Sequence, residues 1–490
     1  MLKLAEQISS AGWKLDNTYA RLPENLLTKI KPTPVKDPTL ILLNDDLLNS
    51  LGLFFNNKKE CAESVFSGNL IPSGSEYIAQ AYAGHQFGYF TVLGDGRALL
   101  LGEQICKNGS RFDIQLKGSG QTPYSRGGDG RAALGPVLRE YIISESMFAL
   151  GIPTTRSLAV VSTGEKVFRE IALPGAILTR VASSHLRVGT FQYAAASKNS
   201  RSLDVLINYA IKRHCPDVKN DKIPALGLLK YVVEKQLSLV VEWMRVGFVH
   251  GVMNTDNTSI SGETIDYGPC AFVNSYSPET FFSSIDFGGR YSFGNQPSIA
   301  HWNMLRFAEA LLPSIHQDKK TAIKIAEESL NDFSKKFDDM WLDMMRKKLG
   351  IINKKNDDKS LVDSLLSIMV SNKADYTNTF LSLVDSRFSN EKIHKNNSFI
   401  SWKKNWEDRL KENNCSKEQS LILMDKNNPT KIPRNHVVEE ALEAANVADF
   451  SLVKKLIDAL SLPYKKEVSD HKYQSPPTQG DENYKTFCGT

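Results

Sequence analysis

The sequence predicts an α+β protein in which a strand-rich first part is followed by a mostly helical second part. Glycines and short apolar runs are concentrated in residues 75–300. Beyond about residue 300, apolar residues recur at helical spacing and are interrupted by stretches rich in Lys and Asn. With 490 residues, 41% of them hydrophobic, the chain has ordinary globular composition and is long enough for two or three domains or one large, elaborated domain.

The first predicted elements are a β-hairpin and the helix that follows it. Residues 97–105 and 111–117 are predicted strands, since apolar residues alternate along the second run. The Lys-Asn-Gly-Ser sequence at 107–110 is a turn signal that joins them. Residues 132–150 carry a broad apolar face at helical spacing, and a Gly and a Pro directly beyond them predict the end of a helix.

The remaining elements follow from the same patterns. A second strand pair is predicted at 157–162 and 166–173, with a turn at Thr163, Gly164 and Glu165. Residues 225–246 carry apolar residues at strong helical spacing and predict a long helix. Further helices are predicted at 298–313, 319–346 and 360–371 and as a pair over 436–461, with polar loops near 353–358 and 390–398.

These elements divide the chain into four segments. The segments are an N-terminal extension (1–75), a strand-rich lobe with one embedded helix (76–175), a helical lobe (176–465) and a C-terminal tail (466–490). The tail is polar and contains a Pro-Pro pair, so we expect it to be mobile.

Composition excludes several classes of protein. The net charge of +5 is small for this length, and no basic block is interleaved with aromatic residues, which disfavours nucleic-acid binding. No apolar run of 18 residues predicts a transmembrane helix, and the N-terminus does not resemble a secretory signal. The six cysteines form no C-x-x-C pair, so a structural zinc site is not expected. We expect a monomeric, cytoplasmic protein that neither enters a membrane nor binds nucleic acid.

A glycine-rich turn is the first candidate for ligand binding. Gly94 and Gly96 flank Asp95 and precede Arg97 at the start of a predicted strand, and a further glycine-rich stretch lies at 84–88. Glycines at such a position allow backbone N–H groups to approach phosphates closely. Taken alone, the pattern is more typical of an ordinary hairpin turn.

A lysine at the end of a strand and a glutamate in the next helix form the second candidate. Lys117 ends one predicted strand, and Glu140 lies inside the following predicted helix, which Asp129, Gly130 and Arg131 open. A lysine held by a helix glutamate binds nucleotide phosphates in kinase folds. The intervening loop has five glycines and almost no large apolar residue, so it cannot pack a core and a ligand is the natural reason for it. A surface lysine and a solvated glutamate are the alternative.

Two arginines form the third candidate. Arg180 and Arg187 are seven residues apart and would share one face if the segment were helical. Each guanidinium suits phosphate oxygens, although two surface arginines would give the same pattern.

The fourth cluster indicates the chemistry most strongly. After the long predicted helix come His250-Gly251 and Asn257, and then Asp266 in an Asp-Tyr-Gly sequence. This order resembles the catalytic loop and the metal-binding Asp-Phe-Gly of kinases, in which Asn and Asp oxygens hold Mg²⁺. Together with the preceding segments, it predicts a bilobal protein-kinase-like fold with additional C-terminal helices.

One position departs from the kinase pattern. The catalytic Asp of kinases stands two residues after the His, and here that position is Val252, which cannot accept a proton. Asp256, directly before Asn257, is the nearby replacement. Transfer of the terminal phosphate is therefore disfavoured.

These residues together resemble the selenoprotein O family, whose bacterial members are called YdiU. The resemblance runs from about residue 10 to about residue 465. It rests on the stretches 17–23 (NTYARLP), 82–88 (YAGHQFG), 116–120 (LKGSG), 122–126 (TPYSR) and 250–257 (HGVMNTDN).

The resemblance implies a protein adenylyltransferase that transfers AMP from ATP to Ser, Thr or Tyr hydroxyls of target proteins and releases pyrophosphate. Asp256 would be the base. Asn257 and Asp266 would hold Mg²⁺ or Mn²⁺. The residues implied to contact the nucleotide, with Glu140 holding Lys117, are Gly94, Gly96, Arg97, Lys117, Asp129, Gly130, Arg180, Arg187 and Asp266.

Two readings remain beside AMP transfer. One is a kinase that transfers the γ-phosphoryl group, and the other is a pseudokinase scaffold that only binds nucleotide. Nothing in the sequence selects the base of the nucleotide, so UMP transfer from UTP is a further option.

Many members of the family carry a C-terminal Cys or selenocysteine, and this chain has Cys488 two residues before its last residue. Cys270 lies two residues beyond the Asp-Tyr-Gly sequence. We hypothesise a regulatory disulfide between Cys270 and Cys488, with two unrelated thiols as the alternative because disulfides are rare in the cytosol.

Overall fold

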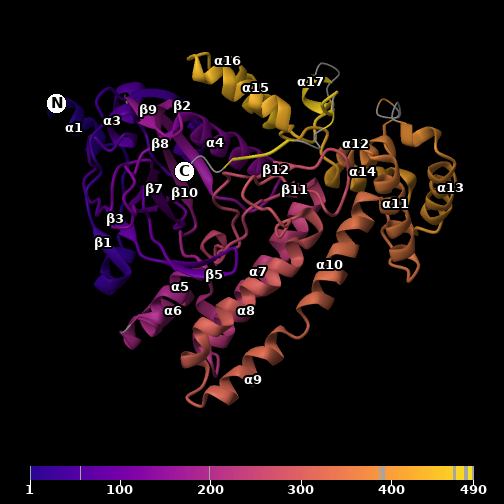
Figure 1. Ribbon diagram of the computed structural model, residues 1–490, viewed down its shortest axis with the longest axis horizontal. Helices are drawn as coiled ribbons and strands as arrows, with labels where there is room; N and C mark the ends of the chain where they lie inside the picture. Colours follow the sequence, from indigo (N-terminus) through magenta and orange to yellow (C-terminus); the bar gives the residue numbers. More distant parts are fainter. Residues whose placement is uncertain are drawn as a thin grey trace.

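The structure is a computed structural model that describes residues 2–55, 57–197, 199–385, 387, 392–466, 471–478, 480 and 484–487. It is a mixed α/β protein in which an antiparallel sheet occupies one side and helices occupy the other (Figure 1). The predicted combination of helices with a β-sheet is confirmed.

The described residues form one large sheet in which every strand pair is antiparallel. The predicted hairpin of residues 97–117 lies at its centre, and its turn closes where the Cys106 N–H donates to the Ser110 carbonyl (2.8 Å). In spatial order, the strands are β1 (Leu27–Lys29), β3 (Ile78–Gln80), β6 (Ala98–Ile105), β7 (Arg111–Lys117), β10 (Ala172–Ala182), β9 (Arg156–Phe168) and β2 (Thr39–Leu43), with β8 (Ala132–Ala133) paired to β10.

Both faces of the sheet are covered, which explains the continuous apolar run at the start of the central strand β6. Leu100 and Leu178 pack into the core that contains α4 (Leu134–Ala149), whereas Leu99 and Ile177 pack into the core on the other face. Side chains alternate between faces along a strand, so neighbouring leucines enter different cores. The second face is covered by α1 (Leu2–Ser9), α2 (Asp45–Ser50) and α3 (Lys58–Phe66).

The second strand pair differs from the prediction. Strand β9 continues through Thr163–Glu165 and turns only after Phe168, which pairs with Ala172 of β10. The three residues 163–165 stand opposite the single residue Gly175, so the predicted turn is a bulge within one long strand. Gly164, with a φ of +68°, provides the irregular backbone conformation that the bulge needs.

The second part of the described chain is mostly helical. The long predicted helix is α7 (Pro224–Val246), and the predicted helix 319–346 is two helices because the chain turns at Asn331 and Asp332, which are weak helix formers. The helices are α5 (Val188–Ala196), α6 (Ser200–His214), α7, α8 (Gln296–Ile315), α9 (Lys319–Leu330), α10 (Phe333–Lys348), α11 (Asp358–Asn372), α12 (Tyr376–Ser382), α13 (Asn397–Lys411), α14 (Lys417–Asn427), α15 (Asn435–Asn446), α16 (Ser451–Leu460) and α17 (His471–Gln474).

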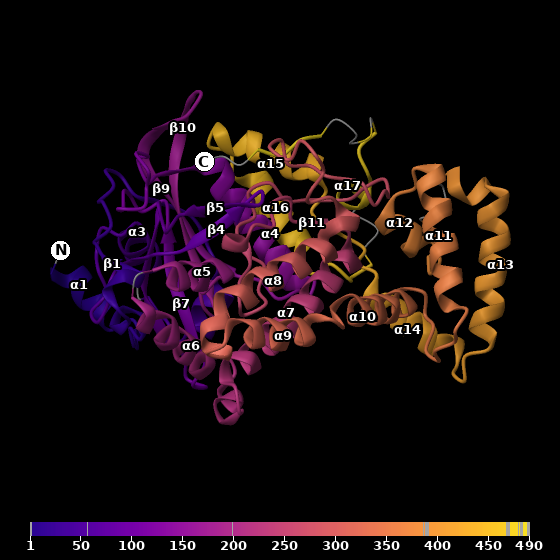
Figure 2. The same ribbon diagram turned by 60° about the horizontal axis from the view of Figure 1, so that its bottom comes forward.

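The C-terminal helices occupy two places. Helices α11, α13 and α14 are set apart at the end of the molecule farthest from the sheet (Figure 2). Helices α15 and α16 instead return to α4, where Glu439 of α15 forms an ion pair with Arg139. Beyond them, Thr486 donates its backbone N–H to the Phe282 carbonyl (2.8 Å).

A buried ion network joins the sheet to α6. Glu103 of β6 accepts hydrogen bonds from Arg111 (2.8 Å) and Arg213 (2.6 Å), and Arg213 also bonds Asp113 of β7 (2.6 Å). Because Glu103 and Asp113 are buried, their charges need these partners. The network fixes the first helices of the second part against the sheet.

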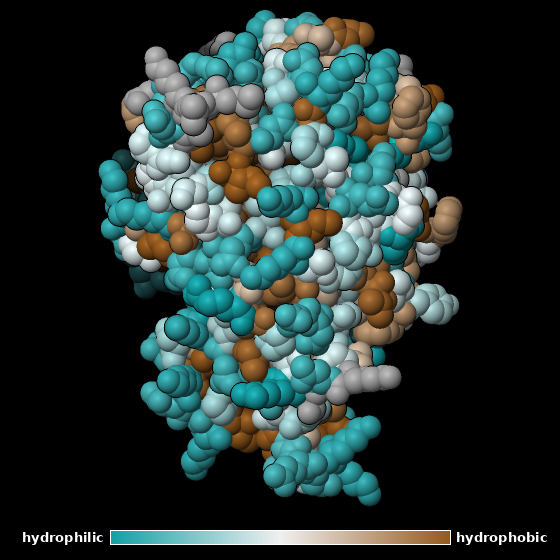
Figure 3. Space-filling view, turned by 90° about the vertical axis from the view of Figure 1, so that its left-hand side faces the viewer, coloured by the Kyte–Doolittle hydropathy of each residue, from teal (hydrophilic) through white to brown (hydrophobic). Residues whose placement is uncertain are grey.

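On the face of the molecule shown in Figure 3, apolar residues lie in small separate patches among hydrophilic ones. This distribution is ordinary for a water-exposed surface. Within the described ranges, no helix combines the length and the apolar composition that a bilayer crossing requires.

Candidate active site

A cavity of about 830 Å³ lies between the sheet and the helical part. Its wall brings together nearly all the residues that the sequence singled out, although they come from segments more than 150 positions apart. Glu140 stands behind Lys117, outside the lining. The predicted residues in the lining are Gly94, Gly96, Arg97, Lys117, Asp129, Gly130, Arg180, Arg187, Asp256, Asn257 and Asp266.

The predicted pair of Lys117 and Glu140 is present in the structure. The Lys117 ammonium at the end of β7 lies 2.6 Å from one carboxylate oxygen of Glu140 in α4 and 3.2 Å from Asp266. The guanidinium of Arg180 donates to the other Glu140 oxygen (Nε, 2.8 Å) and to Asp266 (Nη2, 2.7 Å). Two carboxylates therefore hold two cations at the inner end of the cavity.

Arg187 completes this cluster. Its Nη1 donates to the backbone carbonyl of Asp256 (2.9 Å) and to Asp266 (3.2 Å). The expected shared helix face is wrong: Arg180 belongs to β10, and Arg187 is the residue before α5. The two side chains nevertheless converge on Asp266, to which each donates a hydrogen bond. Both arginines are almost fully buried.

The charges in this cluster are strongly coupled to each other. Burial alone would raise the pKa of Asp266, but Arg180, Lys117 and Arg187 hold it well below its ordinary value. Burial would also raise the pKa of Glu140, and Arg180 and Lys117 lower it. Both acids are therefore ionised at the inner end of the cavity.

The glycine-rich loop forms another wall of the cavity. Asp129 accepts two hydrogen bonds from Arg169 (3.0 and 3.1 Å), so its carboxylate is held in place. Gly130 has a φ of +66°, and a Cβ there would lie 2.1 Å from the Gly120 carbonyl oxygen. Residues 129–131 do not open the helix as predicted, because β8 pairs with β10 before α4 begins.

Tyr124 in the same loop explains the first glycine cluster. A Cβ on Gly94 would lie 2.4 Å from its ring, and a Cβ on Gly96 would lie 2.7 Å from its carbonyl oxygen. These glycines therefore permit a close approach of the loop to the strand as well as to a ligand.

The predicted catalytic loop follows α7 and the short strand β11 (Phe248–Val249) and reaches η4 (Thr255–Asn257), a 3₁₀ turn. His250 is fully buried, and its Nε2 lies 2.9 Å from the Ile265 carbonyl, directly before Asp266. Burial lowers the pKa of His250, so the neutral ring donates this bond. His250 thereby joins the loop to the segment that carries Asp266.

Two buried acids in the cavity have a raised pKa. Burial raises the pKa of both Asp95 and Asp256 to about 6. The Asp95 carboxylate is occupied, since it accepts from the Gln80 N–H (3.0 Å) and the Gln115 amide (3.4 Å). Asp256 Oδ1 is buried and has no hydrogen-bond partner among the described residues. Asp256 Oδ1 packs against Gly84, and the Asp256 side chain lines the cavity with fewer protein partners than Asp95.

A second hairpin lies against Asp256, and the sequence did not predict its role. Strands β4 (Ala83–Gln86) and β5 (Tyr89–Val92) pair with each other, and β4 is bound to the catalytic loop. The His85 N–H donates to Thr255 Oγ1 (2.7 Å), and the Phe87 N–H donates to Asn254 Oδ1 (3.0 Å). Gly84 was visible as part of a glycine-rich stretch, but only the fold shows that its Cα faces Asp256.

We expect the substitution Gly84→Ala to lower the turnover of the enzyme about tenfold to a hundredfold without weakening ATP binding. A Cβ at this position would lie 2.1 Å from Asp256 Oδ1 and would push the carboxylate aside. Gly135→Ala is the matched control, since a Cβ there has no atom within 4 Å. Steady-state kinetics and ATP titration of both variants test this expectation. Equal turnover of Gly84→Ala and the parent chain would contradict it.

Asn257 and Asp266 fit the requirements of a hard divalent cation. The Asn257 amide nitrogen donates to the Val252 carbonyl (3.0 Å), which leaves its side-chain oxygen for a cation at the cavity. Within the described ranges, no group of three or more His, Cys, Asp or Glu side chains forms a ready-made metal site. Mg²⁺ is commonly held by one or two side-chain oxygens together with substrate phosphates, which this donor set matches.

Of the two thiols of the hypothesised disulfide, the structure describes that of Cys270. Cys270 is fully buried; its thiol donates to the Tyr267 carbonyl (3.2 Å), and burial raises its pKa to about 12. Cys488 lies outside the described residues. Thr486, two positions before it, donates its hydroxyl to the Pro269 carbonyl (2.7 Å) next to Cys270.

Comparison with known proteins identifies the family of this chain. The family model described as "Protein adenylyltransferase SelO" matches residues 12–461. The chain is 56% identical over 481 residues to the protein nucleotidyltransferase YdiU of Bacillus cytotoxicus, covering 98% of each chain. It is 54% identical over 484 residues to the proteins of the same name from Bacillus mycoides and Bacillus cereus, covering 98% of this chain and 99% of theirs. The chain belongs to the protein adenylyltransferase SelO family.

Proposed function

We propose that this protein transfers AMP from ATP to a hydroxyl group of a target protein and releases pyrophosphate. The observation that carries the proposal is the position of Asp256 in the wall of the same cavity that the three cations Lys117, Arg180 and Arg187 line. Such cations bind phosphate oxygens, and a carboxylate base activates a hydroxyl. The family assignment supports nucleotide transfer.

In the proposed reaction, Asp256 accepts the proton of a Ser, Thr or Tyr hydroxyl while the hydroxyl oxygen attacks the α-phosphorus of ATP. The bond between the α-phosphorus and the bridging oxygen of pyrophosphate breaks. Lys117, Arg180 and Arg187 stabilise the negative charge that develops on the phosphates. Their present partners Glu140 and Asp266 keep these side chains oriented before the nucleotide arrives.

Asn257 and Asp266 would hold Mg²⁺ or Mn²⁺ with the phosphates. Such a cation, when bound, neutralises charge on the leaving pyrophosphate. Binding of a triphosphate gives Lys117, Arg180 and Arg187 new anionic partners, so Asp266 becomes available to the cation. The remaining nucleotide contacts that we propose are made by Gly94, Gly96, Arg97, Asp129 and Gly130, all in the cavity wall.

The architecture supports the proposal of a bilobal, protein-kinase-like arrangement with additional C-terminal helices. The strand lysine, the helix glutamate and the loop that carries Asn257 follow one another along the chain in the order that such a fold uses, which supports this proposal. Val252 lines the cavity where a kinase has its catalytic Asp, which favours AMP transfer over γ-phosphoryl transfer. The proposal includes transfer of UMP from UTP as a second activity. It also includes a monomeric protein in the cytoplasm.

ATP labelled separately at the α- and γ-phosphates tests the proposal. In the presence of Mg²⁺ or Mn²⁺, we expect target proteins to acquire the α-label and not the γ-label. Label from the γ-position alone would show a kinase and contradict the proposal. The absence of any protein-bound label, with ATP still bound, would identify a scaffold.

We also propose the disulfide between Cys270 and Cys488 as a regulatory element. The docking of Thr486 beside Pro269 supports it, because it brings the chain near Cys270 shortly before Cys488. An oxidant such as peroxide would convert one of the two thiols to a sulfenic acid, and attack by the other sulfur would form the disulfide and release water. The high pKa of the Cys270 thiol makes attack by Cys270 slow. Non-reducing peptide mapping after peroxide treatment should find the linked pair, and two free thiols would contradict the proposal.

A further inference from the structure

The hairpin of β4 and β5 presents an open strand edge beside the cavity. Within the described residues, β5 pairs with β4 alone, and its other edge has no strand beside it. The turn is tight: Gln86 pairs with Tyr89, and both residues between them have positive φ, Phe87 at +50° and Gly88 at +94°. Two such residues make a type I′ turn, which fixes the hairpin as a rigid unit.

The register identifies the groups on the open edge. The Leu93 N–H donates to the Tyr82 carbonyl (2.8 Å), so Tyr82 and Leu93 are a hydrogen-bonded pair. From there, non-hydrogen-bonded and hydrogen-bonded residue pairs alternate along the hairpin. His85 and Phe90 form a pair that turns its backbone groups outward, and the His85 N–H is indeed used outward, toward Thr255. By the same alternation, the N–H and carbonyl groups of Phe90 and Val92 face the open edge.

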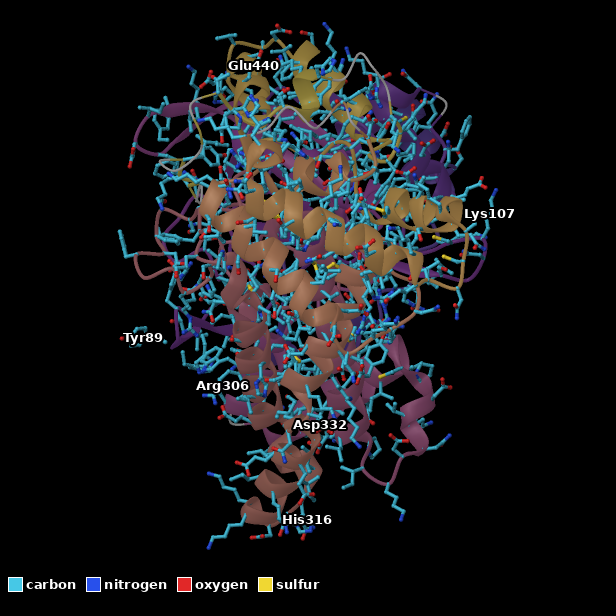
Figure 4. All side chains as sticks on the ribbon, turned by 90° about the vertical axis from the view of Figure 1, so that its right-hand side faces the viewer. Tyr89, Lys107, Arg306, His316, Asp332 and Glu440 are labelled. Carbon is cyan, nitrogen blue, oxygen red and sulfur yellow. The ribbon has the colours of Figure 1, made fainter. Side chains whose placement is uncertain are left out.

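The side chains on β5 are exposed and apolar. Tyr89 is 80% exposed, Val92 59% and Phe90 47%. Figure 4 shows Tyr89 at the periphery of the molecule, with its ring directed outward. Natural edge strands usually carry Lys, Pro or a bulge that prevents pairing, and the sequence Tyr-Phe-Thr-Val of β5 has no such feature.

The open edge is coupled to the proposed base. Gln86 and Phe87 at the hairpin tip line the cavity, and β4 lies on the loop of Asp256. Ile285, 44% exposed, lines the same cavity from another segment. A chain that continues beyond Tyr89 leaves the edge at the hairpin tip, where Gln86 and Phe87 line the cavity. An extended chain advances about 3.3 Å per residue, so residues that follow the docked segment can continue from the tip toward the cavity.

We propose that β5 is the docking strand for the acceptor protein, which adds an extended segment to the open edge. The segment carries apolar residues that cover Tyr89 and Val92, and the modified Ser, Thr or Tyr follows it by a few residues. Strand addition can bind acceptor proteins of different sequence, because main-chain hydrogen bonds provide the affinity and alternate side chains provide the selectivity. This inference rests on the proposed AMP transfer and specifies which hydroxyls that reaction reaches.

Synthetic peptides of the proposed form test the docking strand. One peptide has alternating Val and Gln, which carry no hydroxyl, followed after a short spacer by one Tyr, and its counterpart is N-methylated on the Val-Gln stretch so that it cannot pair as a strand. We expect the KM of the parent enzyme to be about tenfold lower for the first peptide, since several edge hydrogen bonds are lost in the second. Hydrogen exchange should show protection of residues 89–92 by the first peptide only.

Two variants of the enzyme examine the same edge. Val92→Pro removes an outward N–H, which an edge strand tolerates, and Val92→Lys introduces a charge that disfavours pairing. We expect both variants to raise the KM for the first peptide about tenfold, with unchanged kcat and ATP affinity. Val447→Lys is the matched control, since Val447 is 80% exposed between α15 and α16, outside the cavity lining. Its KM should equal that of the parent.

Several outcomes would overturn the docking strand. They are equal use of the two peptides by the parent enzyme, an unchanged KM in both Val92 variants, and labelling of intact proteins without labelling of the first peptide. If the parent enzyme transfers the α-label to neither peptides nor proteins, the proposed AMP transfer itself fails, and the docking strand fails with it.

Discussion

The substitution Asp256→Asn should abolish transfer while ATP binding persists. An amide has the size of the carboxylate but cannot accept the hydroxyl proton, and general-base catalysis contributes about 10²–10⁴-fold to rate. We therefore expect kcat to fall by about that factor. The nucleotide should still bind, because the cations proposed to contact it, Lys117, Arg180 and Arg187, are unchanged. Initial rates with α-labelled ATP, together with ATP titration by calorimetry, measure both quantities.

A control separates loss of the base from a general effect of removing a charge. Asp339→Asn changes an exposed carboxylate on α10, away from the cavity, and should keep the parental rate. Asp95 offers a second comparison, because its pKa is raised as much as that of Asp256 but its carboxylate is bonded to Gln80 and Gln115. Full activity of Asp256→Asn would assign the base to another group.

Glu140→Gln should destabilise the protein strongly. Glu140 is buried and accepts from Lys117 (2.6 Å) and Arg180 (2.8 Å), so the substitution leaves the buried Arg180 and the partly buried Lys117 with Asp266 as their remaining anion. Breaking a buried ion pair on one side costs about 3–5 kcal/mol of unfolding free energy. ATP affinity should also fall, because Lys117 loses the partner that orients it.

Denaturant unfolding of Glu140→Gln measures this loss, and Glu443→Gln on α15 is the matched control. Glu443 is exposed, so its substitution should change the free energy of unfolding by less than about 0.5 kcal/mol. ATP should restore part of the stability of Glu140→Gln, since the nucleotide supplies anions to the same cations. Equal stability of the two variants would show that Lys117 and Arg180 do not depend on Glu140.

Local patterns predicted the hairpin of residues 97–117, the helix of Glu140 and the long helix α7, because each has a clear period and a clear end signal. The prediction of a turn at residues 163–165 was wrong, because these residues form a bulge within β9. A glycine with positive φ serves a turn or a bulge equally, and only the long pairing of β9 with β10 decides between them.

The candidate site shows the same limit. Lys117 and Glu140 could be paired from sequence because a known motif fixes their relation. The convergence of Arg180 and Arg187 on Asp266 could not be predicted from the sequence, since Arg180 is on a strand and Arg187 precedes a helix. The contact of Gly84 with Asp256 and the open edge of β5 depend on tertiary packing between segments about 170 residues apart, which no local period encodes.

The mass added to the acceptor residue tests the central claim most directly. Tandem mass spectrometry of a target protein incubated with ATP and the parent enzyme should find an adenylyl group on Ser, Thr or Tyr. The same target incubated with Asp256→Asn should remain unmodified. A phosphoryl group at that residue, or an adenylyl group placed equally well by Asp256→Asn, would contradict the account.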